Sequence, residues 1–145
     1  MTTHGAFPIA EFAFPGPLRD RLIAAILDGT KTSTSSTLLE YSTENEPLPV
    51  IGARQTVVDS HNLAVAVIQT VTVEIIRLAD VSIAHARAEG EGFISVAAWR
   101  TGHEAFWHST ELRAHLKDPT FTVDDNTLVV LERFQVIQSL DHSAR

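Results

Sequence analysis

The hydroxyl-rich segment from Gly29 to Thr37 is the part of the sequence best suited to chemistry. It reads Gly-Thr-Lys-Thr-Ser-Thr-Ser-Ser-Thr, so Lys31 is surrounded by hydroxyl groups in a chain whose only other lysine is Lys117. A lysine amine in a pocket can lose its proton and act as a base, or stay charged and stabilise a developing oxyanion. The ordinary alternative is a solvated loop lysine, and the residue types alone favour that alternative.

The neighbouring hydroxyls of Thr32, Ser33 and Thr34 could assist Lys31 or position a substrate. In a regular strand Lys31 and Thr34 would point to opposite faces, because strand side chains alternate. A joint role therefore requires Lys31 to project from the loop before the strand, or a bulge between the two residues. The alternative for the whole run is a polar, half-buried strand with turn hydroxyls.

A second candidate is the acidic segment Glu89-Gly90-Glu91-Gly92, which follows a predicted helix. Glycine lets the backbone turn tightly and leaves room for a ligand beside the carboxylates of Glu89 and Glu91. The alternative is a glycine that ends the helix, followed by a solvated acidic loop.

An aromatic stripe forms the third candidate. Trp99, His103 and Phe106 are spaced i, i+4 and i+7, so they share one face of a helix. Such a stripe is usually core, although aromatic faces can also stack on nucleobases. His103 and His108 lie about 140° apart around a helix, so the zinc-protease motif is absent, and we expect no metal and no cofactor.

Hydrophobic spacing predicts the elements that must position these residues. Residues 1–15 have no clear period and predict an arm or irregular edge, while residues 139–145 predict a frayed tail. The pattern is α+β, with enough strands to close a small barrel. The predicted elements are a helix over 17–28, a loop entering a strand over 29–37, a surface loop over 42–53, a hairpin of strands over 56–59 and 63–76, helices over 81–89 and 95–107, and a closing strand over 128–137.

Composition narrows the class of protein. The chain has 145 residues, 44% of them apolar, which favours a single globular domain over residues 1–145. It has no cysteine and a net charge of −7, so disulfides are excluded and a grip on long nucleic acid is disfavoured. Nucleotide-cofactor and hydrolase glycine motifs are absent. Without a signal peptide or a membrane-spanning run, we expect a cytoplasmic protein that does not bind membranes.

Five motifs in order resemble the ASCH domain family, over a core of about residues 12–138. The resemblance implies a PUA-like small β-barrel with flanking helices and a cleft near the GxK loop. Domains of this family are thought to bind RNA or nucleotides, and its members include an N4-acetylcytidine amidohydrolase and small ribonucleases. The motifs are Gly29-Thr30-Lys31-Thr32-Ser33-Thr34, Glu46-Pro47-Leu48-Pro49, Ala88-Glu89-Gly90-Glu91-Gly92, Trp99-Arg100 with His103, and Glu132-Arg133-Phe134.

The resemblance also implies a catalytic set. The working lysine and threonine of the GxKxxT motif correspond to Lys31 and Thr34, and the glutamate that follows a short helix corresponds to Glu89. In such a trio a lysine base activates the threonine or a water, and the carboxylate passes the proton to the leaving amine. The residues expected to bind substrate are Thr32, Ser33, Tyr41, Glu91, Trp99 and His103.

Departures from the family pattern bear on the substrate. Many longer members carry an acidic residue where this chain has Phe93 and Ala53, and the chain has an extra helical stretch around residues 99–116. We therefore expect Tyr41 and Trp99 to shape a different pocket.

Three functions remain open from the sequence, with a modified nucleoside, a nucleotide or single-stranded RNA as partner. The first is a small hydrolase of a modified nucleoside. The second is a noncatalytic RNA-binding or nucleotide-binding module, in which arginines supply local positive charge. The third is a ribonuclease in which His103 or Tyr41 transfers protons. The candidate arginines are Arg19, Arg21 and Arg54. The oligomeric state is not predicted.

Overall fold

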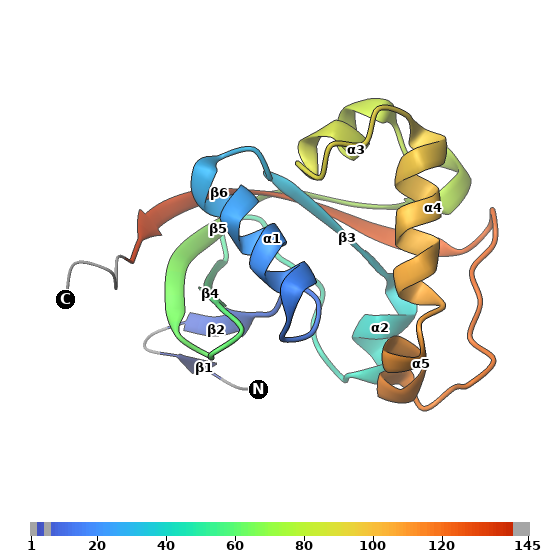
Figure 1. Cartoon of the computed structure of the whole chain (residues 1–145), viewed down its shortest axis with the longest axis horizontal. Coiled ribbons are helices and arrows are strands. Elements are labelled where there is room, and N and C mark those ends of the chain that lie inside the picture. The colour runs from blue at the N-terminus through green and yellow to red at the C-terminus, as the bar shows by residue number, and fades with distance from the viewer. Residues whose placement is uncertain (1–2, 5–6, 141–145) are drawn as a thin grey trace.

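One mixed sheet runs through the molecule in the strand order β1-β2-β4-β5-β6-β3 (Figure 1). The computed structural model describes residues 3–4 and 7–140. The β2–β4 pairing is parallel and the other pairings are antiparallel. The strands are β1 (Thr3–His4), β2 (Phe7–Ala10), β3 (Ser33–Thr37), β4 (Arg54–Val58), β5 (Ala64–Arg77) and β6 (Leu128–Ser139).

In the part of the chain that the structure describes, five α-helices flank the sheet. In Figure 1, α1 lies over one part of the sheet, and α3, α4 and α5 lie together at the other end, near β3. Among the described residues, no helix is long and apolar enough to cross a membrane. The helices are α1 (Pro17–Asp28), α2 (Leu38–Thr43), α3 (Ile83–Ala88), α4 (Val96–Trp107) and α5 (Thr110–Leu116), with a 3-10 turn η1 at Leu78–Asp80.

The predicted α+β class is confirmed. The two longest strands, β5 and β6, pair along most of their length and curve in the manner of a barrel wall (Figure 1). The strand order places β1 and β3 at opposite ends, so the hydrogen-bonded ladder of the described residues stays open. The helix predicted over 17–28 and the hairpin over 56–76 are present, and Ser95 caps α4 as expected.

The prediction differs from the structure in three places. Residues 1–15 were predicted as an arm or irregular edge, and they contain β1 and β2, which lie at one edge of the sheet. β2 pairs with β4, far along the chain, and local periodicity cannot reveal such a partner. Helix α2 was not predicted, although Thr37 and Glu40 form a capping box at its start. The predicted tail overlaps the end of β6, and residues 141–145 lie outside the described part of the chain.

Two apolar clusters form the core and fix the helices on the sheet. In one cluster, Ile23 and Ile26 of α1 pack with Phe12 and Phe134. The other cluster joins α4 and α5 to β6 and is built around Trp99, Trp107, Leu112, Val129 and Leu131. Burial of this apolar area is the main favourable term that holds α4 against the sheet beside β3.

Candidate functional site

Lys31 lies in the loop between α1 and β3. Helix α1 ends at Gly29, whose φ of 89° is left-handed, and the Lys31 backbone amide then bonds to the carbonyl of Ala25 at 3.0 Å. This turn directs the Lys31 side chain inward, where the residue is 2% exposed. Lys31 therefore projects from the loop, as a joint role with strand residues requires.

Three oxygen atoms surround the Lys31 amine. Nζ donates to the carbonyl of Ser33 at 2.8 Å and to the carbonyl of Glu89 at 3.3 Å, and it lies 3.5 Å from Glu89 Oε1. An ammonium group has three N–H donors and can serve all three acceptors, whereas a neutral amine has two. The surroundings thus favour a fixed positive charge over a general base.

Glu89 follows α3 and is the centre of the polar cluster. Its Oε2 accepts from Ser35 Oγ at 2.6 Å and from Trp99 Nε1 at 2.7 Å, and lies 3.0 Å from His85 Nε2. Its Oε1 lies 3.1 Å from His103 Nε2. Burial alone would raise the pKa of Glu89, but the hydrogen bonds from both histidines and the charges of His103 and Lys31 hold this pKa well below its ordinary value.

His103 joins α4 to this carboxylate. Its Nδ1 lies 2.9 Å from the carbonyl of Trp99, which can only accept, so Nδ1 carries a proton. Its Nε2 faces the Glu89 carboxylate, which favours a second proton there. Burial lowers the pKa of His103, but the hydrogen bond and charge of Glu89 outweigh burial and leave the pKa raised. The ring is thus held as an imidazolium beside Glu89.

Glu91 is the more accessible carboxylate of the pair and lies in the loop before α4. Burial of its carboxyl group and the charge of Glu89 raise the pKa of Glu91, and the positive charges of Lys31 and His103 offset only part of that rise. The pKa values of the two glutamates are therefore shifted in opposite directions. Glu89 is locked as an anion, whereas Glu91 can exchange a proton closer to neutral pH.

Glu89, Glu91 and His103 could also hold a metal ion. One ligand atom from each residue lies within 4.8 Å of the others. A divalent ion there would have to displace the proton on His103 Nε2 and would lie near the Lys31 ammonium. Within the described residues, this is the set with metal-ligand geometry, and its charges favour protons over a cation.

Gly90 is the residue that lets α3 approach the Lys31 loop so closely. Its φ is +72°, and a Cβ at this position would lie 2.5 Å from the carbonyl oxygen of Thr30 and 2.7 Å from the Cα of Lys31. The Thr32 backbone amide donates to the carbonyl of Ala88 at 2.8 Å and fixes the same contact. The close contact between the backbones of residues 88–90 and 30–32 thus places the Glu89-Gly90-Glu91 segment beside Lys31.

Thr34 does not join this cluster. Ser33 Oγ bonds to the carbonyl of His85 at 3.3 Å, and Ser35 bonds to Glu89, so both serines face α3. Alternation places Thr34 on the other face of β3, opposite Glu132 in β6. The hydroxyl beside the buried amine and carboxylate belongs to Ser35.

Tyr41 also lies apart from Lys31. Its hydroxyl bonds to Ser36, and burial followed by the charge of Glu132 raises its pKa. Because Ser36 and Glu132 lie on the Thr34 side of β3, Tyr41 belongs to that side of the sheet. The structure therefore does not bring Tyr41 together with Lys31.

The remaining expected binding residues have structural contacts. Trp99 is fully buried and stacks on His103 with ring centroids 4.3 Å apart, so its face is not free for a base. Ser33 is fully buried beneath α3. Thr32 is exposed, and its carbonyl accepts from the Phe134 amide. Of the expected binding set, Glu91 and His103 remain at the accessible side of the cluster.

Ser35 and His85 are site residues that sequence reasoning missed. His85 Nε2 lies 2.7 Å from Ser35 Oγ, and both contact Glu89. The signal for His85 was its i, i+4 spacing to Glu89 on a predicted helix. Ser35 is one of several hydroxyl residues in a row, and the sequence alone does not tell which of them faces Glu89. Only the register of β3 in the sheet shows that it is Ser35.

The three candidate arginines do not form one basic cleft. Arg19 is buried and donates to the carbonyls of Phe12 and Ala13, so its role is structural. Arg54 donates to the side chain of Gln69. Arg21 on α1 is the arginine whose charge acts on Glu91.

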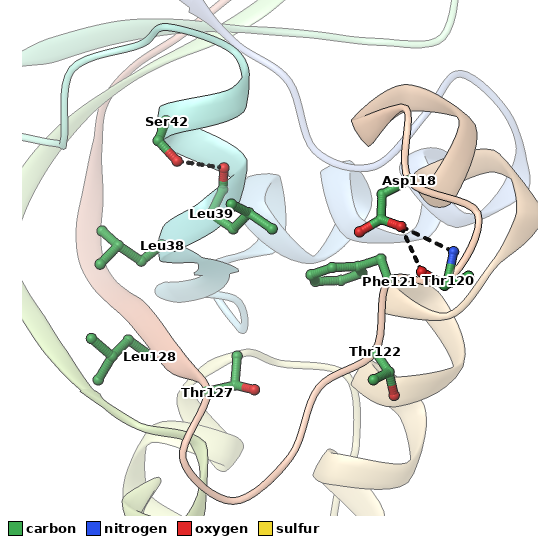
Figure 2. A pocket seen from close by; sticks show the side chains of 9 residues that line it. All are labelled: Leu38, Leu39, Ser42, Asp118, Thr120, Phe121, Thr122, Thr127 and Leu128. Carbon is green, nitrogen blue, oxygen red and sulfur yellow. Dashed lines mark hydrogen bonds between the residues drawn. The ribbon is translucent and has the colours of Figure 1, made fainter.

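Two surface cavities lie elsewhere. Figure 2 shows the larger, about 510 Å³, between α2, the 118–122 loop and the start of β6. Its walls are mainly apolar or hydroxyl side chains, and its one carboxylate, Asp118, accepts from the amide and hydroxyl of Thr120 at 3.0 and 2.9 Å. This cavity offers no group for acid–base chemistry. The smaller is lined in part by Glu132 and Thr70.

Comparisons with known proteins agree with the architecture. The ASCH domain family model matches residues 11–138. A protein of Enterococcus faecalis V583, assigned to the family DUF984, is 28% identical, with a TM-score of 0.77 over 91% of this chain and 77% of that chain. An ASCH domain from Lactobacillus crispatus JV V101 is 26% identical, with a TM-score of 0.72 over 90% of this chain and 80% of that chain.

An ASCH structure from Zymomonas mobilis, 12% identical with a TM-score of 0.52, shares the fold over 92% of this chain and 72% of that chain. No curated protein matches the sequence. The α+β sheet and its flanking helices agree with the PUA-like barrel expected from the resemblance. Because the family model covers most of its length, the chain belongs to the ASCH domain family.

Proposed function

We propose that this protein hydrolyses the exocyclic amide of an N-acylated nucleoside, of which N4-acetylcytidine is the simplest example. One observation carries the proposal: four ionisable side chains from three separate segments meet in one place. Glu89, Glu91 and His103 offer ligand atoms within 4.8 Å of one another, and Lys31 Nζ lies 3.5 Å from Glu89. The pKa values of Glu89, Glu91 and His103 are all shifted, and a cluster of carboxylates and a histidine with shifted pKa values is typical of a catalytic site.

The two accessible groups of the cluster suit general acid–base catalysis. In the proposed reaction Glu91 takes a proton from water, and the water oxygen bonds to the acyl carbon. The carbon–nitrogen bond then breaks as His103 releases its Nε2 proton from the contact with Glu89 and gives it to the amine nitrogen. The proton on Glu91 finally returns to His103 through solvent, so the products are a free carboxylic acid and the deacylated nucleoside.

Lys31 and Glu89 act beneath these groups as positioning residues. Both side chains are 1% exposed, so they do not reach a bound substrate in this conformation. Glu89 holds His103 in its protonated form through the contact at 3.1 Å. The Lys31 charge in turn stabilises two neighbouring carboxylates, which would otherwise repel each other.

The charge balance of the site favours a nucleoside over a long RNA. Lys31 and His103 offset Glu89 and Glu91, and the whole chain carries a net charge of −7. Binding to the RNA backbone gains most of its affinity from neutralising phosphates, and these residues supply little free positive charge for that purpose. A neutral heterocycle with an amide has no phosphates, so its binding does not need this positive charge.

The test is an assay of purified protein with N4-acetylcytidine and other N-acylated cytidines, with cytidine and the free acid measured as products. We expect turnover by the wild type, and a loss of about a hundredfold or more in kcat/KM for Glu91→Gln, because removal of a general base costs roughly 10² to 10⁴ in rate. Glu74→Gln is the matched control, since Glu74 is exposed on β5.

Absence of turnover on every acylated cytidine, or equal turnover by Glu91→Gln, overturns the proposal. Salt-sensitive RNA binding without any product would favour the noncatalytic RNA-binding module instead. RNA cleavage that depends on His103 would favour the ribonuclease. Repeating the assay with a chelator, and again with added zinc, tests whether the metal-ligand geometry is used.

A further inference from the structure

A second cavity, of about 310 Å³, opens beside β2 and β4 and is unrelated to the proposed active site. Its lining does not include Lys31, Glu89, Glu91 or His103. Side chains from both strands, from the loop over 46–50 and from the long strands β5 and β6 surround it. Its volume is at the lower end of the range for sites that bind one small molecule.

Glu132 is the residue that makes this cavity unusual. It lies on β6, is 6% exposed, and lines the cavity together with Thr70. Thr70 Oγ1 donates to Glu132 Oε2 at 2.7 Å. A carboxylate can accept about four hydrogen bonds on its two oxygens, so most of its capacity is left open.

No cation in the described part of the chain forms an ion pair with Glu132. Arg54 lines the same cavity, but its Nε donates to the Gln69 side chain at 3.2 Å. Buried carboxylates in proteins are normally paired, because removal from water is costly. Burial accordingly raises the pKa of Glu132, and the Thr70 hydrogen bond offsets only part of that rise.

Part of the cavity wall is apolar. Prolines at positions 8, 47 and 49 form this part, together with Ile9, Leu48 and Val50. Residues 47–50 belong to the loop before β4, and two backbone hydrogen bonds hold the end of this loop against β5. The Gly52 amide donates to the Thr70 carbonyl, and the Thr70 amide donates to the Ala53 carbonyl, both at 2.9 Å. A planar group could lie against these walls without reordering the loop.

The charges around the cavity select the kind of ligand. Glu11, Glu46 and Glu132 line it, against the single guanidinium of Arg54. This excess of carboxylates repels phosphate and attracts cations or groups rich in N–H donors.

We propose that the cavity binds a planar group with two adjacent N–H donors, held by Glu132 as a bidentate hydrogen-bonded pair. Two small molecules of this chemistry are a guanidinium compound and the base of guanosine. Two parallel N–H donors match the two oxygens of a carboxylate, which makes this pairing both strong and selective. The proposal stands or falls independently of the hydrolase.

Isothermal titration calorimetry of the full chain with two matched probe pairs tests this site. Agmatine carries the guanidinium, and its urea counterpart N-carbamoylputrescine lacks the charge. Guanosine carries adjacent N–H donors, and inosine lacks the exocyclic amine. We expect agmatine or guanosine to bind, its counterpart to bind roughly tenfold more weakly or less, and Glu132→Gln to weaken binding by a similar factor. Whichever probe binds identifies the source of the planar group.

Glu74→Gln is the control for charge removal, because Glu74 is exposed on β5 outside the cavity. Backbone amide NMR shifts of Thr70, Gln55 and Val50 in the wild-type chain report binding without any variant, so loss of folding in Glu132→Gln would not remove the test. Failure of both probes to bind overturns the proposal, as does equal binding of guanosine and inosine, or equal binding of the probe by Glu132→Gln and the wild type.

Discussion

Glu89 and Glu91 are two residues apart, yet their environments push their pKa values in opposite directions. Glu89 receives hydrogen bonds or charge from five groups, and its pKa lies well below its ordinary value. Glu91 is more accessible, but partial burial of its carboxyl group and the charge of Glu89 raise its pKa. Two carboxyl groups with separated pKa values take separate roles, one as a permanent anion and one as a proton acceptor.

The pH dependence of hydrolysis follows from Glu91 and His103. The pKa of Glu91 lies above its ordinary value of 4.5, so kcat/KM should rise as pH increases through that raised pKa. The pKa of His103 lies above its ordinary value of 6.5, so kcat/KM should fall as pH increases through it. Measured pH–rate profiles should therefore be bell-shaped.

His103→Gln should lose the alkaline limb of that profile, and His61→Gln, in an exposed turn, should keep it. An unchanged alkaline limb in His103→Gln would assign the acid to another group.

The opposite orientations of Ser35 and Thr34 in β3 lead to a second prediction at the residue scale. Ser35→Ala removes a hydrogen-bond donor from a buried carboxylate, which should lower the unfolding free energy by roughly 1–3 kcal/mol and also reduce kcat. Thr34→Ala should leave kcat within about threefold of the wild type, because Thr34 faces the other side of the sheet.

Steady-state kinetics and urea unfolding of both variants check this difference. Loss of turnover in Thr34→Ala with Ser35→Ala unaffected would restore the threonine role that the family resemblance implies.

At the scale of the elements, the site depends on the crossing of α3 with the loop between α1 and β3. Gly90→Ala places a methyl group 2.5 Å from the Thr30 carbonyl oxygen at a φ of +72°, so the two segments must separate. We expect a loss of about 3 kcal/mol or more in unfolding free energy, with reduced turnover.

Gly92→Ala is the control for Gly90→Ala. Gly92 has a φ of +82° but nothing within 4 Å of an added Cβ, so this variant should show only the backbone strain of roughly 1–2 kcal/mol. Urea midpoints of the two variants give the comparison. Equal destabilisation would mean that the close approach is not needed.

Some of the helices and strands can be predicted from local sequence patterns, and others cannot. Helix α1 and strands β4 and β5 follow from strong local periodicity, and Ser95 is a clear cap for α4. β2 depends on a parallel partner in β4 that no local pattern encodes. The meeting of Lys31 with Glu89, 58 positions apart, came from the family resemblance, because spacing cannot bring two loops together. Strand alternation did predict that a regular strand would direct Lys31 and Thr34 to opposite faces.

For the whole molecule, the buried charges make stability depend on pH. Glu89 has a lowered pKa, so its contribution is present above its ordinary value of 4.5 and is lost as pH falls through the lowered value. His103 has a raised pKa, so its contribution is complete below 6.5 and is lost as pH rises through the raised value. Both contributions are complete between these two ordinary values.

Glu89→Gln should therefore lower the melting temperature most between pH 4.5 and 6.5, where both contributions are complete. The expected loss there is about 3 kcal/mol or more, because Lys31 and His103 would be left as buried cations without a carboxylate. Calorimetric melting of the wild type, Glu89→Gln and Glu74→Gln, from well below pH 4.5 to well above pH 6.5, gives the measurement. A difference that does not change with pH would show that the cluster is held by packing rather than by charge.

For the proposed hydrolysis, the cytidine product must bind over the cluster centred on Glu89, and in neither of the two surface cavities described above. The most direct measurement is an NMR titration of the wild-type chain with cytidine, the expected product, following backbone amides and histidine side chains. We predict that the largest shifts occur at Ser35, Glu91 and His103. Shifts confined to the cavity of Figure 2, or to the cavity beside Glu132, would contradict the account.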